Sequence, residues 1–276
     1  VLLIVSRPEA EGLSFIDPRA TALPLSDALA PLGKAVELAV LADGTLEGLR
    51  NALDEAQAAG RPFAVVHFDG HGVVDPVRGT GQLCFEYPDD VDSGRVTRRV
   101  ALVDAETFGE LLSDRGVPLV FLEACQTAAA RGTAPASVAV SLLECGVGSV
   151  VAMSHVVRAD STRRFVDAFY RMLGQGQSIS ASMAAAQSAL RLHTLQDRLG
   201  EPAVAGSSPL QDWFVPVLYQ QEGGDTALLP ADAWTGESPP AEPEDDPLPS
   251  PPDHGFVGRA WDLMVVQRHL RTERWL

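Results

Sequence analysis

Short apolar runs alternate with amphipathic helical patterns along most of this chain, and that alternation constrains its fold more than any other feature. Strand, helix and strand repeated in this way are typical of a parallel sheet, because each helix carries the chain back along the sheet. The apolar runs are "VLLIV" at 1–5, "AVELAVL" at 35–41, "FAVVHF" at 63–68, "PLVFL" at 118–122 and "GSVVAM" at 148–153. The helical patterns lie at 25–32, 46–58, 107–112 and 137–144. The sequence predicts an α/β fold with a mostly parallel sheet and helices on both faces.

The pattern changes between residues 81 and 103, where "LCFEY" and "RVTRRVAL" flank the turn-rich "PDDVDSG". We expect a β-hairpin inserted after the third strand. Two amphipathic helices then follow, with apolar faces at 165–173 and 179–190 that are spaced for core packing. The run "DWFVPVLY" at 212–219 predicts a final strand.

An acidic, proline-rich tract, "ESPPAEPEDDPLPSPPD", begins at residue 237 and cannot supply a core, so it is expected to be an extended linker. A new amphipathic helix follows it. We therefore divide the chain into a domain at 1–221, a linker at 222–254 and a helical segment at 255–276.

The charge balance and the cysteine usage exclude several functional classes. A net charge of −16 argues against nucleic-acid or anionic-membrane partners, because phosphate binding needs clustered Lys and Arg. No apolar run approaches the ~20 residues that span a bilayer, and "VLLIV" is too short for the core of a signal peptide. The 3 cysteines do not make a secreted disulfide framework, so a reducing cytoplasm is expected. The missing initiator methionine suggests a fragment of a longer protein.

Two of the predicted strands lead directly into residues that carry chemistry. "FDGHG" places His71 after one strand, and "PLVFLEACQT" places Cys125 after another. Because the carboxyl ends of parallel strands meet at one edge of the sheet, the two residues are expected to come together. Alone, His71 would be interpreted as a turn histidine satisfied by backbone groups. With Cys125 at the matching position, a catalytic pair is the favoured interpretation.

The pair has a chemical rationale. A thiol with an ordinary pKa of roughly 8.5 is mostly protonated at neutral pH, and a neighbouring imidazole activates it or protonates the leaving amine. Gly72 follows the histidine, and its N–H together with that of Cys125 would form an oxyanion hole, in which one donor is typically worth ~3 kcal/mol. This chemistry needs no cofactor.

The ordered set of blocks resembles the CHAT domain, a caspase-like cysteine peptidase module found in bacterial proteins beside tetratricopeptide repeats or NTPase modules. "VVHFDGHG" is similar to the family's histidine block and "VFLEACQT" to its cysteine block. "GVGSVVAMSHVV", "FVDAFYRMLGQGQSISASMAAAQ" and "DWFVPVLY" continue the resemblance in the family's order. The resemblance implies a caspase-like three-layer αβα sandwich. It also implies a cysteine endopeptidase that cuts polypeptides through a thioester acyl-enzyme, with a role in bacterial immunity or signalling.

Two acids are candidates for selecting the substrate side chain. Glu123 lies two residues before Cys125, where family members commonly carry a small residue. A salt-bridged or solvated acid is the simpler interpretation. The alternative is that Glu123 lines the pocket for the side chain before the cut bond, as an acid does in metacaspases, which cut after Arg or Lys. Asp69 is a second candidate, either for that pocket or for orienting His71.

Three further polar residues need an interpretation. Ser154 and His155 stand where family members often carry a tryptophan, so they are expected to line the cleft. His67 lies four residues before His71, but that spacing serves a metal ion on a helix rather than on a strand. No metal site is therefore predicted.

The segment "FVGRAWDLMVVQRHL" at 256–270 has two interpretations. It resembles the opening of AAA-type and NB-ARC-type ATPase modules, although no G-x-x-x-x-G-K-[ST] loop occurs in the sequence. The alternative is a terminal helix docked on the peptidase domain. We expect a sensor or ATPase module on the same chain to gate a peptidase that cuts after Arg or Lys. The rival hypothesis is a catalytically silent caspase-fold module for interaction or signal relay, against which the intact His71 and Cys125 count.

Overall fold

The computed structural model describes residues 1–17, 19–41, 43–126, 134–153, 159–200, 212–230 and 260–272. Its strands are β1 (Leu2–Val5), β2 (Ala39–Leu41), β3 (Val65–Val74), β4 (Gly81–Glu86), β5 (Val100–Asp104), β6 (Leu119–Gln126), β7 (Ser149–Met153) and β8 (Pro216–Gln220). Its α-helices are α1 (Arg19–Leu29), α2 (Leu46–Ala58), α3 (Pro88–Asp92), α4 (Ala105–Ser113), α5 (Ala134–Glu144), α6 (Ala159–Gly174), α7 (Ile179–Gly200) and α8 (Ala260–Thr272). Two 3₁₀ helices span Ala30–Ala35 (η1) and Asp212–Phe214 (η2).

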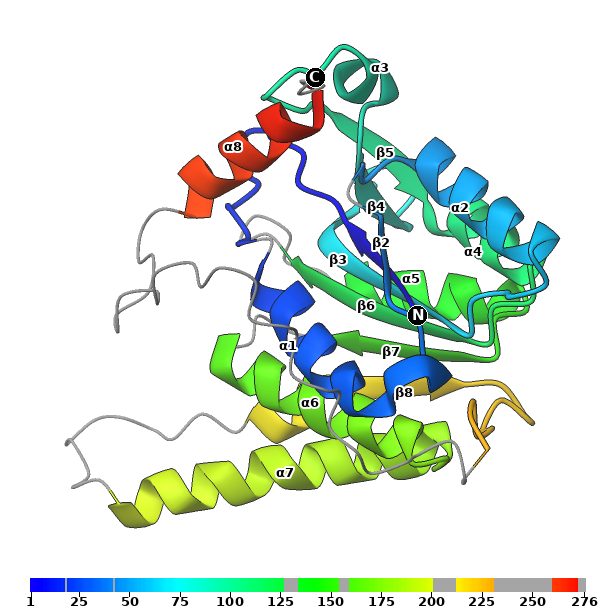
Figure 1. Ribbon diagram of the computed structural model, residues 1–276, viewed down its shortest axis with the longest axis vertical. Helices are drawn as coiled ribbons and strands as arrows, with labels where there is room; N and C mark the ends of the chain where they lie inside the picture. The colour runs from blue at the N-terminus through cyan, green and yellow to red at the C-terminus, as the bar shows by residue number, and fades with distance from the viewer. Residues whose placement is uncertain are drawn as a thin grey trace.

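The strands form one mixed sheet in which the longest path has the order β2-β1-β3-β6-β7-β8. β1, β2, β3, β6 and β7 run parallel, and β8 pairs antiparallel with β7 at one edge. β4 and β5 form an antiparallel pair that branches from the second half of β3. The predicted mostly parallel sheet with an inserted hairpin is confirmed. The short helix α3 belongs to the connection that joins the two hairpin strands, beyond their ends (Figure 1).

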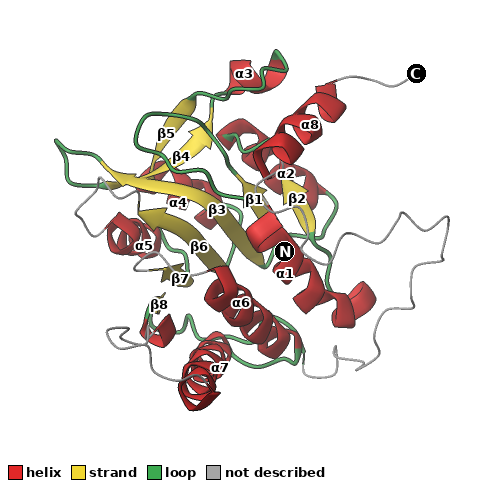
Figure 2. Cartoon of the chain, turned by 90° about the vertical axis from the view of Figure 1, so that its left-hand side faces the viewer, coloured by secondary structure: helices red, strands yellow, loops and turns green. Residues whose placement is uncertain are grey.

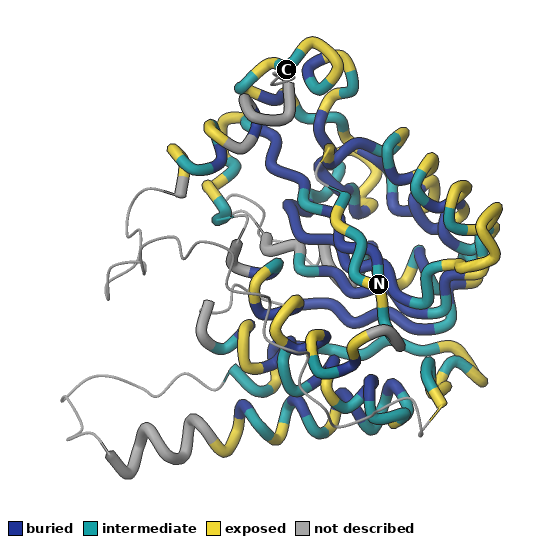
Figure 3. Tube along the Cα trace, viewed as in Figure 1, coloured by how far each residue is buried: buried dark blue, intermediate teal, exposed yellow. Residues whose placement is uncertain are grey.

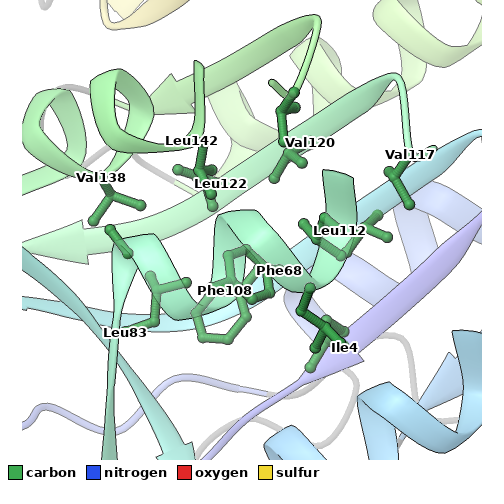
Figure 4. Close-up of a cluster of buried hydrophobic side chains, with 14 of the residues drawn as sticks. Ile4, Phe68, Leu83, Phe108, Leu112, Val117, Val120, Leu122, Val138 and Leu142 are labelled. Carbon is green, nitrogen blue, oxygen red and sulfur yellow. The ribbon is translucent and has the colours of Figure 1, made fainter. Parts of the chain in front are cut away.

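Helices cover both faces of the sheet and make the three-layer sandwich that was predicted (Figure 2). On one face, α2, α4 and α5 enclose a core in which Phe68 of β3 lies beside Phe108 of α4 (Figure 4). On the other face, α1, α6 and α7 enclose a second core, in which Phe121 of β6 packs on Phe165. Successive residues of one strand serve the two cores in turn, because side chains alternate across a sheet. The central strands are consequently buried along most of their length (Figure 3).

Two strands extend further than the apolar runs predicted. The sequence places His71 and Cys125 just beyond strands that end at residues 68 and 122, but β3 continues to Val74 and β6 to Gln126. The reason is pairing on both sides: the second half of β3 lies between β6 and the antiparallel β4. The glycines of "FDGHG" therefore sit in a ladder instead of forming a turn.

The segments after β8 show where the chain returns to the sandwich. Residues 222–230 pack against the start of α7, where Ala227 bridges Ser178 and the Asp225 carboxylate accepts a hydrogen bond from the Ser180 backbone (2.8 Å). The rest of the predicted linker lies outside the described residues. α8 then packs beside the segment that follows β1 (Figure 1). In the described parts of the chain, no helix has the length and apolar character needed to cross a membrane.

Candidate active site

The register of three strands brings His71 between two cysteines. His71 of β3 pairs with Cys125 of β6 on one side and with Cys84 of β4 on the other. Neighbouring strands in a sheet lie about 4.8 Å apart, so the three residues form a short row across the sheet near the carboxyl end of β6. The structure describes the backbone of Cys125, whereas its side chain lies outside the described residues. Gly72 follows His71 in the same ladder, opposite Gln126.

His71 is buried, and one nitrogen of its ring has no hydrogen-bond partner in the described structure. Its side chain is 2% exposed, and its Nδ1 is buried without a hydrogen-bond partner in the described structure. Burial lowers the pKa of the imidazole, and the positive charge of Arg7 lowers it further, against the raising effects of a Ser14 backbone hydrogen bond and of Asp69. The ring is therefore held in its neutral form at neutral pH, in which Nδ1 or Nε2 can accept a proton.

Cys84 occupies the other side of His71 but is chemically suppressed. Its side chain is buried, and burial raises the pKa of its thiol to about 12. It stays protonated at any physiological pH, and a protonated, inaccessible thiol is a poor nucleophile. Cys145 directly follows α5, and its thiol contacts the backbone carbonyl of Glu106 in α4. It therefore takes no part in this row. Of the three cysteines, Cys125 is thus the candidate nucleophile beside His71.

Asp69, two residues before His71, is held by Arg7. The Arg7 Nη2 donates to Asp69 Oδ2 at 2.5 Å, and Nη1 donates to the Asp69 carbonyl at 2.6 Å. The remaining Arg7 donors go to the carbonyls of Ser6 and Ile16. Burial raises the pKa of the Asp69 carboxyl, and the neighbouring Arg7 opposes that effect. The pair ties the end of β1 to the histidine block, and removing one partner would leave a buried, uncompensated group.

Glu123 lies on β6 in a different environment. Its carboxylate accepts a hydrogen bond from Thr21 Oγ1 at 2.8 Å and lies 3.2 Å from His67 Nε2, and its side chain is 13% exposed. The other His67 nitrogen lies 3.0 Å from the Tyr170 hydroxyl, whose pKa burial raises, and the ring stacks on Phe121. Because an ionised carboxylate only accepts hydrogen bonds, Nε2–H of His67 donates to Glu123.

No metal centre emerges from these groups. Within the described residues, no three His, Cys, Asp or Glu side chains are grouped in a way that would hold a metal ion. Both nitrogens of His67 already face Tyr170 and Glu123. Ser154 and His155, which were expected to line the cleft, lie outside the described residues.

A cavity of about 700 Å³ lies away from the row, beside Val1 and Val65 where β1 and β3 begin. It is larger than the cavity of about 120 Å³ beside His71. In sheets of this type the reactive groups collect at the carboxyl ends of the strands, so we place the candidate site beside His71 despite the smaller cavity.

Sequence reasoning missed three residues that shape this site: Arg7, Thr21 and Tyr170. Their contacts join residues separated by 62 or more positions, which no local pattern reveals. For Arg7 there was one signal, since this charged residue lies only two positions after the apolar run "VLLIV", which forms the buried strand β1.

Comparison with known proteins agrees with this architecture. A family model described as the CHAT domain matches residues 4–223, from β1 through β8. CHAT domains are a caspase-like family related to proteases. Comparison with the curated proteins gives no significant match. Because the family model covers most of the sequence, the chain belongs to the CHAT domain family.

Proposed function

We propose that this chain is a cysteine endopeptidase in which Cys125 is the nucleophile and His71 transfers the proton. One observation carries the proposal: a buried, neutral imidazole with an unpartnered Nδ1 lies in register with Cys125 on the adjacent parallel strand. Residues opposite one another on neighbouring strands share a face of the sheet. A ring nitrogen that is buried and unsatisfied is rare unless it has a catalytic or ligand-binding task.

The proposed reaction proceeds through an acyl-enzyme. His71 takes the proton from the Cys125 thiol, and the thiolate attacks the carbonyl carbon of the peptide bond. The backbone N–H groups of Gly72 and Cys125 donate hydrogen bonds to the oxyanion that forms on the carbonyl oxygen. The imidazolium then protonates the leaving amine, which departs as the C–N bond breaks and a thioester forms. His71 next removes a proton from a water molecule that attacks the thioester, and the thiol and a new carboxylic acid are released. No cofactor enters these steps.

Substrate choice is proposed to rest on Glu123, with cleavage after Arg or Lys. Asp69 already has a cationic partner in Arg7, so a substrate cation would have to displace a buried ion pair to reach it. Glu123 instead faces a hydroxyl and an imidazole, and a carboxylate can accept about four hydrogen bonds. Arginine is expected to be preferred over lysine because its planar guanidinium bonds a carboxylate bidentately. Ser154 and His155 would complete the cleft.

The proposed setting is the cytoplasm of a bacterium, with a sensor or ATPase module on the same chain that controls the peptidase. The proposed substrate is a polypeptide. The net charge of −16 supports a cationic peptide over an anionic partner.

The dyad is tested by substitution and by active-site labelling. Cys125→Ala and His71→Ala are each expected to lower peptide turnover about a thousandfold or more, and the double variant is expected to be no worse, because the two groups act as one unit. Cys84→Ala is the matched control, since it removes a thiol from the same row and should leave turnover unchanged. An acyloxymethyl ketone probe should label Cys125. Substantial turnover by purified Cys125→Ala protein would overturn the proposal.

A further inference from the structure

Helix α8 lies beside the segment that separates β1 from α1. We call residues 8–16 of that segment the cover. Arg268 of α8 pairs with Glu9 of the cover at 2.9 Å and donates to the carbonyl of Arg7 at 2.7 Å. Trp261, at the start of α8, meets Phe15 of the cover edge to face, with ring centroids 5.8 Å apart. Figure 1 shows α8 beside the segment that follows β1, although the two are far apart in sequence.

The inner end of Arg268 reaches a buried carboxylate. Its guanidinium lies 3.5 Å from Glu86 of β4 and also donates to the carbonyl of Val96. Burial raises the pKa of Glu86, while Arg268 and Arg98 oppose that shift. A buried carboxylate is costly unless cations lie near it, so the contact between Arg268 and Glu86 helps to hold α8 on the domain. Met264, one turn before Arg268, is buried on the same face of the helix.

The cover and α8 together enclose the candidate catalytic imidazole. A cavity of about 120 Å³ is lined by Ser14 and Ile16 of the cover, by Trp261 and Met264 of α8, and by His71. The Ser14 backbone also raises the pKa of the His71 imidazole, in opposition to burial and to Arg7. In the described parts of the chain, the cover and α8 close this side of the imidazole, which is 2% exposed.

We propose that α8 is an intramolecular strap that holds the cover closed over His71, and that release of α8 opens the site to polypeptides. A series of hydrogen bonds joins the helix to β3, the strand that carries His71. Arg268 binds the carbonyl of Arg7, the Arg7 side chain binds Asp69, and Asp69 lies two residues before His71. Ser14 and Ile16 of the cover line the same small cavity as the His71 ring. A module that pulled on α8 would therefore act on the geometry around His71.

This inference rests on the proposed function only for its consequence, so its test uses a readout that does not require catalysis. Val266 is 52% exposed on α8, and Val266→Pro breaks the helix while it leaves the side chains of Trp261 and Arg268 in place. Val266→Ala is the matched control, because it leaves the helix intact. The accessibility of His71 is measured by carbethoxylation with diethyl pyrocarbonate, followed by mass spectrometry. His67 is fully buried between the sheet and α6 and reports any global unfolding.

In Val266→Pro protein, His71 is expected to react about tenfold faster or more, with faster hydrogen exchange in residues 8–16, while His67 stays protected. Val266→Ala should behave like the unaltered chain. The proposal is overturned if the amides of α8 exchange freely in Val266→Pro protein while His71 and the cover stay as protected as before. If Val266→Pro also exposes His67, Arg268→Gln is measured instead. Faster reaction of His71 then supports the proposal, and unchanged protection of His71 and the cover overturns it.

Peptide turnover separates the two proposals. If both hold, Val266→Pro raises turnover of an arginine peptide by about the factor by which His71 becomes more reactive, and adding Cys125→Ala abolishes it. If His71 opens and no peptide is cut, the strap stands and the proposed peptidase function fails. If the unaltered chain does cut the peptide, and as fast as Val266→Pro protein does, the strap does not restrain the site and is overturned.

Discussion

At the level of single residues, His71 is shaped by two opposing requirements. Burial protects the site from water but disfavours a charged imidazole, and Arg7 adds a like charge nearby. The Ser14 backbone and Asp69 act in the other direction and favour the charged ring, which fits the proposed role of His71 as a base that takes up a proton. A general base that begins neutral at physiological pH can accept the thiol proton directly.

This environment predicts the titration of His71. In Cys125→Ala protein, which removes coupling to a thiolate, the pKa of the His71 imidazole is expected to lie below the ordinary value of 6.5. The unfolded chain then binds more protons than the folded one just below pH 6.5, so this residue makes the free energy of unfolding fall as the pH falls through that value. NMR titration measures the pKa directly. A value above 6.5 would show that burial does not control this ring.

Glu123 and Asp69 make a matched pair for testing substrate choice. Glu123→Gln is expected to lower kcat/KM for arginine peptides about tenfold to a hundredfold, because the buried guanidinium of the substrate loses its carboxylate. Peptides with a neutral residue before the cut bond should change little. Cleavage after Asp should be absent in the unaltered chain, since a second carboxylate would be repelled.

Asp69→Asn is the comparison for that experiment. It leaves Arg7 buried without its ionic partner, so we expect a loss of stability, measured as a lower melting temperature, with the arginine preference retained. A preference for arginine that survives Glu123→Gln and disappears in Asp69→Asn would assign the pocket to the other acid.

At the level of elements, the sequence predicted the strands and helices well where apolar periodicity decides the structure. The pattern at 46–58 matches the bounds of α2, and the runs at 118–122 and 148–153 lie within or next to β6 and β7. It was wrong about where β3 and β6 end. Glycine-rich "FDGHG" resembles a turn locally, but strand β4 pairs with it from a later part of the chain, and such pairing is invisible to local propensity.

One glycine of that stretch is required by packing. A Cβ at Gly70 would lie 2.8 Å from the Phe68 ring and 3.3 Å from the Ser6 carbonyl. The position must therefore remain small for β1 and β3 to pair beside His71. The sequence predicted that His71 and Cys125 come together, and β3 and β6 pair these two residues, whereas their catalytic role stays a prediction. The sequence gives no signal for Thr21 and Tyr170 and only a weak one for Arg7, because each reaches the site from a distant part of the chain.

At the level of the whole molecule, two apolar cores hold a rigid sheet, and the candidate chemistry lies near one edge of it. The same edge is where α8 contacts the cover, through Arg268 and Glu9, which lie 259 positions apart in the chain. The family match ends at residue 223, so this contact joins the CHAT domain to a part of the chain beyond it. Such an arrangement lets events outside the domain reach the residues around His71.

The overall charge of the molecule leads to a final prediction. A net charge of −16 produces a negative field that raises the local concentration of cationic peptides and disfavours anionic ones. For a peptide of net positive charge with arginine before the cut bond, kcat/KM should fall roughly threefold to tenfold as ionic strength rises from about 0.02 to about 0.3 M, since the Debye length shortens. The control is a peptide with the same residues around the cut but distant acidic residues that make it net negative. Its kcat/KM should rise over the same range, because screening removes a repulsion. If both peptides respond to salt with the same sign, the effect belongs to the local contact with Glu123 and the field of the whole molecule plays no part in substrate capture.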